Sequence, residues 1–426
     1  MSIRNIGGEF SKQKLIAKGI RAKRSNMIVN HFPSSANPGQ TIIINFPQLN
    51  EHDVIAPGTS KLLFDINLTS NDDNRTLVNN ISRNLVSRMV LKFNSKVATS
   101  IDDYDIFYSY RDQWLSIGEK KHRIQQGIIS GNGGQSKNAI KHRIGAKDKS
   151  TNTKDQAIST AFNKTFCLPL DHEILLRPYY PSGMTGKLTL EITLNNASKV
   201  IKATKPAAAT LTGSYNISNI RLEFDVIHSA DVAMKLSNEL IQDALLFDRI
   251  TRHSFEILDN TKTSWTFNFN TPAKSLKGIL FLFKKDITDF ENAVDEFVNP
   301  NITNTTVTIN GVSNQLFSSG MKVWQQYENA YKFFGSLNKE DYEKVLSATS
   351  IKPEDFYTDK FSLWLDLRST VDNRLHGSGL NLDNGMATIS VEVEKGAGTG
   401  TLICYTYQIM DAQINIEHGL VRDVIY

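Results

Sequence analysis

The sequence has little cysteine and no long apolar run. It contains two cysteines in 426 residues, too few for a disulfide framework. Cys167 and Cys404 each lie in an apolar, strand-like run, which predicts buried thiols in a reducing compartment. The longest apolar runs, such as Gly278–Phe283, fall far short of the roughly 18 residues that a membrane-spanning helix needs. The N-terminus lacks the continuous apolar stretch of a secretory signal. We therefore expect a soluble intracellular protein.

Signatures of catalysis and metal binding are also missing. No His-x-x-x-His pair, Cys-x-x-Cys pair, nucleophile elbow or phosphate-binding loop occurs. The densest carboxylate group, Asp102, Asp103 and Asp105, opens a helical pattern, where negative charge favours the helix N-terminus. A calcium loop would need a glycine bend and a distal glutamate, which do not follow. We expect no enzymatic activity and no cofactor, although a carboxylate pair assembled from distant strands would leave no local pattern.

Positive charge is concentrated near the N-terminus. The whole chain carries +4, whereas residues 1–24 hold seven basic residues and one acidic residue, 7 − 1 = +6, which leaves 4 − 6 = −2 for the remainder. A second basic stretch, Lys137–Lys154, carries 6 − 1 = +5 after a glycine-rich turn and is interpreted as a solvated polar loop. We expect the N-terminal arm to contact a polyanion, either nucleic acid or an acidic partner. The basic residues of the arm are Arg4, Lys12, Lys14, Lys18, Arg21, Lys23 and Arg24.

Most of the remaining chain has the periodicity of strands. A hydrophobic content of 40% is enough to build a core. Leu188–Leu194 and Ile220–Val226 alternate apolar and polar residues, which predicts half-buried strands. Three segments instead place apolar residues every three or four positions and are predicted to be helices, with their apolar stripes facing the core. These segments are Asp102–Ile117, Ser229–Phe247 and Met321–Phe334.

The two halves of the chain repeat the same order of elements. Phe166–Asp171 (FCLPLD) aligns with Phe361–Asp366 (FSLWLD) at an offset of 361 − 166 = 195. Phe224–His228 aligns with Ile414–His418 at 418 − 228 = 190. The offset drifts because loop lengths differ between divergent copies of one fold. The repeat predicts a duplicated domain.

This duplication predicts a mostly β protein made of two tandem eight-stranded antiparallel jelly rolls, with a few helices in the long connections. Jelly rolls suit the sequence because their Greek-key connections combine long loops with short turns. The predicted boundaries are a basic N-terminal arm at residues 1–30, a first jelly roll at 31–228, a linking helix at 229–250 and a second jelly roll at 251–426.

Particular segments resemble a known family. Val78–Phe93 (VNNISRNLVSRMVLKF), followed by Asp102–Phe107 (DDYDIF) and Tyr110–Trp114 (YRDQW), resembles the first jelly roll of double jelly-roll major capsid proteins. The nearest resemblance is to those of polinton (maverick) elements and adintovirus-like viruses, with the virophage and adenovirus hexon lineage further off. Leu367–Gly379 in the second half is also similar to theirs. The basic stretch Lys137–Lys154 matches no pattern of the family, so its role stays open.

The resemblance implies a structural function without catalytic residues. It implies a homotrimer that forms a pseudo-hexagonal capsomer and tiles the icosahedral shell of a virion assembled inside the host cell. Implied partners are neighbouring capsomers, penton and minor capsid proteins, and packaged DNA, which the N-terminal arm would meet on the inner side of the shell. We expect four aromatic residues in the core rather than in contacts between copies: Trp265, Trp324, Tyr327 and Trp364.

A different class of protein remains as the alternative. A tandem β-sandwich carbohydrate-binding protein or a glycoside hydrolase would share the fold class. The basic arm, the missing secretory signal and the scarcity of tryptophan clusters argue against it. A penton or minor capsid protein is a closer rival, but such proteins usually need one jelly roll.

Overall fold

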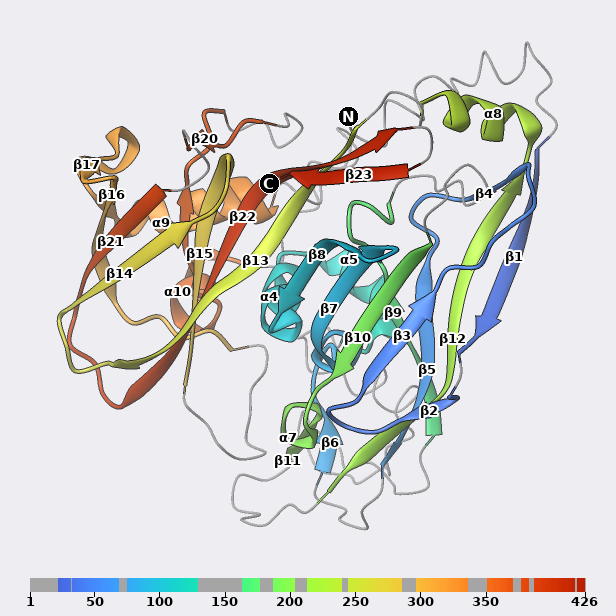
Figure 1. Ribbon diagram of the computed structural model, residues 1–426. Helices are drawn as coiled ribbons and strands as arrows, with labels where there is room; N and C mark the ends of the chain where they lie inside the picture. Colours follow the sequence, from blue (N-terminus) through green and yellow to red (C-terminus); the bar gives the residue numbers. More distant parts are fainter. Residues whose placement is uncertain are drawn as a thin grey trace.

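Strands dominate the structure, as the alternating segments predict. The computed structural model describes residues 22–31, 33–68, 75–128, 163–176, 187–203, 213–239, 244–285, 296–335, 351–370, 377–382, 387–417 and 420–425. The described strands form two β-sandwiches that lie side by side, one from each half of the chain (Figure 1). Each sandwich consists of two antiparallel sheets with apolar side chains enclosed between them.

The first sandwich comes from the N-terminal half. Its first sheet contains, in spatial order, β1 (Lys23–Asn30), β12 (Tyr215–His228), β5 (Lys61–Leu68) and β9 (Asn163–Pro169), with β2 (Ser35–Ala36) and β4 (Asp53–Ile55) also paired to β12. The facing sheet contains β3 (Thr41–Asn45), β10 (Leu188–Leu194), β7 (Val86–Phe93) and β8 (Lys96–Asp102). Two short strands, β6 (Arg75–Leu77) and β11 (Ile201–Ala203), pair separately. Along β10 every leucine and isoleucine is buried and every polar residue is half-buried, so its alternation is confirmed.

The second sandwich repeats this design. One sheet contains β13 (Ala244–Asp259), β22 (Thr401–Glu417), β15 (Ser275–Lys285) and β19 (Leu363–Asp366), with β20 (Leu380–Asn381) on β15 and β23 (Leu420–Ile425) on β22. The facing sheet contains β14 (Ser264–Thr271), β21 (Ala387–Lys395), β16 (Ile302–Ile309) and β17 (Val312–Ser313), with β18 (Met321–Lys322) on β16. The apolar run noted in the sequence belongs to β15, which is buried on both faces. Within it Gly278 is required, because a Cβ there would lie 2.4 Å from the Leu365 carbonyl oxygen of β19.

The two sandwiches have the same strand order. If the eight strands that form the main paths of each pair of sheets are numbered along the chain, the first pairs with the eighth, the eighth with the third, and the third with the sixth. In the other sheet the second pairs with the seventh, the seventh with the fourth, and the fourth with the fifth. Both sandwiches follow this order without exception, so the duplication inferred from the sequence is a duplication of topology.

Helices fill the long connections, and their bounds differ from the predicted ones. The segment 102–117 contains the end of β8, α4 (Tyr104–Gln113) and the start of α5 (Ile117–His122). The segment 321–334 contains β18, α9 (Val323–Ala330) and most of a π-helical turn, η4 (Tyr331–Gly335). The other short helices are α3 (Ile81–Asn84), η1 (Arg123–Gln126), α7 (Ala197–Val200), η3 (Gln315–Phe317) and α10 (Pro353–Asp359). The apolar periodicity located these helices, but the predicted segments also included neighbouring strand residues that have the same apolar spacing.

Two predicted domain limits need correction. The linking helix predicted at 229–250 is shorter: α8 covers Ala230–Glu239, and residues from Ala244 onward already pair with β22 in strand β13. Ladder pairing across the sheet overrides the helical spacing there, and Phe247 is buried as a strand residue. The predicted arm, 1–30, is also too long. Residues from Lys23 onward belong to β1, which pairs with β12 along its whole length.

The strand registers define two ends of the first sandwich. Lys23 pairs with His228, which also pairs with Asp53, so the start of β1 lies at one end, here named the arm end. Asn67 pairs with both Asn163 and Asn216 at the opposite end. The N-terminal residues before β1 and the chain that leads into Asn163, which carries the basic stretch 137–154, are therefore attached at opposite ends of the sandwich.

Candidate functional site

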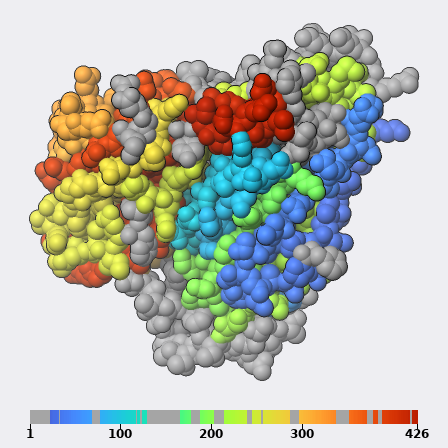
Figure 2. Space-filling view, in the orientation of Figure 1, coloured from blue at the N-terminus to red at the C-terminus, as the bar shows by residue number. Residues whose placement is uncertain are grey.

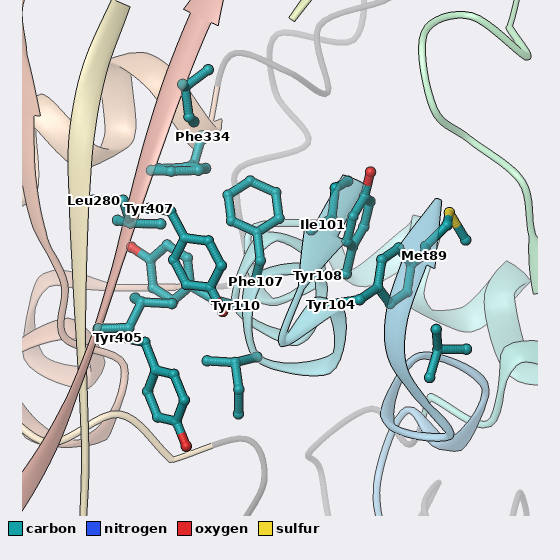
Figure 3. Close-up of a cluster of buried hydrophobic side chains, with 14 of the residues drawn as sticks. Met89, Ile101, Tyr104, Phe107, Tyr108, Tyr110, Leu280, Phe334, Tyr405 and Tyr407 are labelled. Atoms are coloured by element: carbon teal, nitrogen blue, oxygen red, sulfur yellow. The ribbon is translucent and has the colours of Figure 1, made fainter. Parts of the chain in front are cut away.

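The junction between the sandwiches is the feature that sets the shape of the whole chain. Helix α4, which follows β8 in the first sandwich, lies against the outward face of β15 and β22 of the second (Figure 3). Chain direction changes at Asp103, whose φ of 46° lies in the left-handed region that turns the strand into the helix. Nine of the ten residues of α4 are buried. The helix is therefore an internal element of the two-sandwich body.

Strand β22 is buried on both faces because of this contact. Its inward residues, such as Cys404 and Gln408, face the second sandwich's own core, where the Gln408 amide donates to the Thr271 hydroxyl at 2.8 Å. Its outward residue Tyr407 is fully buried against the first sandwich. The Tyr407 ring lies 5.3 Å from that of Phe107, and its hydroxyl donates to the Asp103 carbonyl oxygen at 2.9 Å. An Arg252–Asp103 ion pair closes the edge of the contact.

Aromatic rings from both sandwiches meet around Trp114, the residue that ends α4. The indole is fully buried. Its centroid lies 6.1 Å from Tyr327, 6.3 Å from Phe334 and 6.1 Å from Phe356, all of the second sandwich. Tyr110, one turn earlier, contacts Phe334 at 5.2 Å and hydrogen-bonds to the Ser362 hydroxyl. Large aromatic surfaces packed edge-to-face and stacked in this way fix relative orientation as well as supplying hydrophobic stabilisation.

A buried ion network holds α4 within the first sandwich. Arg83 of α3 is fully buried, and its guanidinium donates to Asp112 Oδ2 at 3.1 Å and to Asp171 Oδ2 at 2.7 Å. It also donates to the Tyr104 hydroxyl. Arg111 forms ion pairs with the same two carboxylates. Burial alone would raise the pKa of the Asp112 carboxyl, but attraction to Arg83 and Arg111 outweighs it and lowers that pKa. The network thus keeps two carboxylates charged in the interior.

His172 makes the junction sensitive to acid. Burial lowers the pKa of this imidazole to about 4, with Asp171 opposing the shift and Arg111 adding to it. Its Nδ1 accepts from the Ile174 backbone N–H at 3.3 Å, and its ring lies 5.7 Å from that of Phe247 in β13. The pKa of His172 in the folded chain lies below its usual value of about 6.5, so the unfolded chain binds the proton more readily than the folded chain does. The contribution of neutral His172 to folding stability is therefore fully present only above about pH 6.5 and is lost as the pH falls.

We therefore expect stability to fall on mild acidification. Between pH 7 and pH 5 the free energy of unfolding should decrease by about 2 kcal/mol from His172 alone, as protons bind the unfolded chain in preference to the folded one. Denaturant unfolding at the two pH values, with His172→Leu as the comparison, measures this difference. An equal decrease in wild type and variant would show that His172 is not its source.

The sequence-predicted residues lie in several different places. Lys23 and Arg24 lie on β1, where Arg24 forms an ion pair with Asp225 of β12. The other arm residues, Arg4, Lys12, Lys14, Lys18 and Arg21, and the stretch 137–154, lie outside the described residues. The aspartate group lies at the start of α4, as the sequence predicts: Asp102 ends β8, Asp103 is the N-cap residue, and Asp105 lies in the first turn. Asp103 also pairs with Arg252, and buried Asp105 faces Lys199 at 3.3 Å.

The aromatic predictions are confirmed with one exception. Trp265 and Trp364 are buried, and Tyr327 packs half-buried against the core. Trp324 is 68% exposed, so its placement in the core was wrong. It belongs to an exposed apolar group at the β17–α9 edge of the second sandwich, named here the α9 patch. The α9 patch consists of Val312, Leu316, Val323 and Trp324.

The described part of the chain offers little for ligand chemistry. No group of three or more histidine, cysteine, aspartate or glutamate side chains within it is placed to hold a metal ion. Among the same residues, no helix has the length and apolar character to cross a membrane. Cys404 is buried, which raises the pKa of its thiol, and Cys167 is half-buried. The junction around α4 can hold the two sandwiches in one fixed orientation relative to each other.

Comparisons with known proteins identify the fold of the two-sandwich chain. No protein-family model matches the chain, and no curated protein matches it. Among solved structures, the chain is similar to the protein in a quasi-atomic model of the PBCV-1 virus capsid, with a TM-score of 0.61, 10% identity, and 95% of this chain and 97% of that chain covered. It is also similar to the mavirus major capsid protein, with a TM-score of 0.54, 11% identity and coverages of 94% and 90%. The Faustovirus major capsid protein matches with a TM-score of 0.56 and 8% identity, and the match covers 93% of this chain and 91% of that chain. The double jelly-roll fold predicted from the sequence is confirmed.

Proposed function

We propose that this chain is the major capsid protein of a virus or virus-like element. Three copies associate into a six-sided capsomer, each copy supplying two similar blocks, and these capsomers tile the shell of the virion. The observation that carries the proposal is the exact repeat of strand order in two sandwiches locked together by α4. A fixed angle between the blocks is what a tile requires, since a flexible linker would not define a closed ring. The similarity to capsid proteins over nearly the whole chain supports it.

The proposed role needs no covalent chemistry. Neighbouring capsomers, and proteins that fill the five-fold vertices or lie beneath the shell, are the partners it implies. Contacts within a capsomer must be large, while contacts between capsomers must be weak enough for misplaced units to leave. The carbohydrate-related alternative is not favoured, because the solved structures named above, which match more than 90% of this chain, are capsid proteins.

The proposal is tested by the mass and shape of the purified chain. Light scattering after size-exclusion chromatography should give 3 × 47.8 = 143.4 kDa, and electron microscopy should show particles with a triangular or hexagonal outline. A single species of 47.8 kDa at micromolar concentration, with no regular particles, would count against a capsomer.

The basic arm is best tested in the same preparation. We propose that its residues before β1 contact the packaged genome or an internal protein, which rests on the charge of residues 1–22, 5 − 1 = +4, and on their attachment at the arm end. Deletion of residues 2–21 keeps β1 intact, so trimers should form while nucleic acid bound by the particles decreases. Unchanged shells with unchanged nucleic acid content would refute this role. Failed shell assembly from intact trimers would instead identify the arm as a tether between capsomers.

A further inference from the structure

The duplicated topology exposes a difference between two equivalent helices. Helix α4 follows the fifth strand of the first sandwich and precedes the sixth, and α9 stands at the same place in the second. Nine of ten residues are buried in α4, whereas only Gln326 and Ala330 are buried among the eight residues of α9. The second sandwich covers α4, whereas among the described residues α9 is covered only on the side where Tyr327 packs near Trp114.

The outward sheet faces differ in the same way. In the second sandwich, the outward residues of β22 and β15, such as Tyr407 and Leu280, are apolar or aromatic and fully buried, and Tyr407 packs against Phe107 of α4. In the first sandwich, the equivalent face of β1, β12 and β5 is open and polar, and it is named here the first-sheet face. Its exposed or half-buried residues include Arg24, Asn26, Ile28, Lys61, Glu223 and Asp225.

We infer that the α9 patch of one copy binds the first-sheet face of a second copy. This inference rests on the proposed function and names the contact that would close the capsomer. The template is the junction within the chain, where the α4 side of the first sandwich meets the outward sheet face of the second. Repeating that relation from the second sandwich to the next copy's first sandwich pairs α9 with β12 and β5, the equivalents of β22 and β15, and places it beside β1 at the edge of the same sheet.

Exposed apolar side chains mark both surfaces. Val312, Leu316 and Trp324 are 69%, 64% and 68% exposed within a short stretch of one sandwich edge, an arrangement typical of a contact surface. On β1, Met27 and Val29 pack against the core, so Ile28 between them points outward and is 50% exposed. Trp324 has the size and exposure of an interface anchor.

The positions of the two surfaces suit a closed ring. β1 and β12 lie at one flank of the molecule, and β16, β17 and α9 lie at the opposite flank (Figure 1). Two different patches on opposite flanks make a head-to-tail interface, which closes into a ring when the rotation between copies allows it. Each copy then uses both surfaces once.

The test is a pair of variants on the full-length chain. Trp324→Glu combined with Leu316→Glu places two carboxylates in the α9 patch, and Ile28→Arg places a charge on the first-sheet face. Each change is at an exposed side chain, so the thermal unfolding midpoint of the monomer should stay close to that of wild type. We expect trimer dissociation constants at least about 100-fold higher, measured by analytical ultracentrifugation. The matched control is Met234→Glu on α8, which is 64% exposed and should leave the trimer intact.

Mixing the two defective proteins gives the sharper result. Each retains one working surface, so an equimolar mixture should form a pair of 2 × 47.8 = 95.6 kDa and stop there. A mixture that stays at 47.8 kDa, or variants that trimerise like wild type, would overturn the inference about the contact. In either case, a trimer of the wild-type chain would leave the capsomer proposal standing. A wild-type chain that does not trimerise would overturn both.

Discussion

Replacement of Arg83 by methionine is expected to lower the free energy of unfolding by about 3–5 kcal/mol, the usual cost of leaving a buried charge without its partner. Methionine approximates the length of the side chain, so the loss is one of charge and hydrogen bonding rather than of volume. Asp112, which is 2% exposed at its side chain, would lose its strongest cation and, among the described residues, retain Arg111, Asn80 and Gln126 as donors. Chemical denaturation followed by circular dichroism measures the change.

Two further variants separate the network from a general surface effect. Arg24→Met removes an arginine from an ion pair whose arginine side chain is 66% exposed, and it should change stability by less than about 1 kcal/mol. Arg83→Met combined with Asp112→Asn removes both charges, so it should be less destabilising than Arg83→Met alone. A double variant as unstable as the sum of the two single variants would argue that Arg83 and Asp112 act independently.

Replacement of Trp114 by alanine should destabilise the chain by about 3–5 kcal/mol, as expected for a fully buried aromatic side chain. The cavity would open between the sandwiches, because the rings of Tyr327, Phe334 and Phe356 all face the indole. We therefore expect two consequences: a lower unfolding midpoint and faster proteolytic cleavage between the sandwiches. Thermal unfolding and limited proteolysis at matched temperatures measure them.

Trp324→Ala is the matched control for this prediction. It makes the same chemical change at a side chain that is 68% exposed, so the stability of the monomer should change by less than about 0.5 kcal/mol. If both variants lost stability equally, the contrast between a buried junction and an exposed patch would be wrong.

The duplicated fold could be predicted because its signal is local. The alternation in β10 and the matching strings at Phe166–Asp171 and Phe361–Asp366 are each readable within a few residues. Both strings contribute to the sixth strand of their sandwich, β9 and β19. By contrast, β1 has little alternation, and its partner lies about 200 residues away, so the sequence suggested an arm where the structure has an edge strand.

The junction was only partly predictable, because burial of a helix depends on what the rest of the chain places over it. Trp114 belongs to an apolar stripe with helical spacing, and Trp324 lies in a second segment with such a stripe, yet only Trp114 is covered. Arginine is rarely buried, so Arg83 gave no sign of being a core residue beyond its place in a family-like segment. The repeat between the two halves did carry one indication of these ion pairs. Asp171 and Asp366 occupy equivalent positions, and Asp171 accepts a hydrogen bond from Arg83 while Asp366 accepts one from Arg368.

The C-terminal strand adds a second tie between the sandwiches. β23 pairs with β22 of the second sandwich, and the Lys96 ammonium of the β7–β8 hairpin donates to the Arg422 carbonyl oxygen. In Figure 2 this strand lies across the line where the two halves meet. The halves are therefore joined by the covalent link through α8, by α4 and by β23.

The contrast between the two outward sheet faces also separates closure within a chain from contact between copies. Exposed aromatic surface favours aggregation, and in the folded chain the aromatic ring of Tyr407 is covered by the chain's own α4. The matching surface on the first half instead carries the ion pairs Lys61–Glu223 and Arg24–Asp225, so it is polar and needs no such cover. Closure within the chain therefore needs no partner, whereas the proposed contact between copies depends on protein concentration.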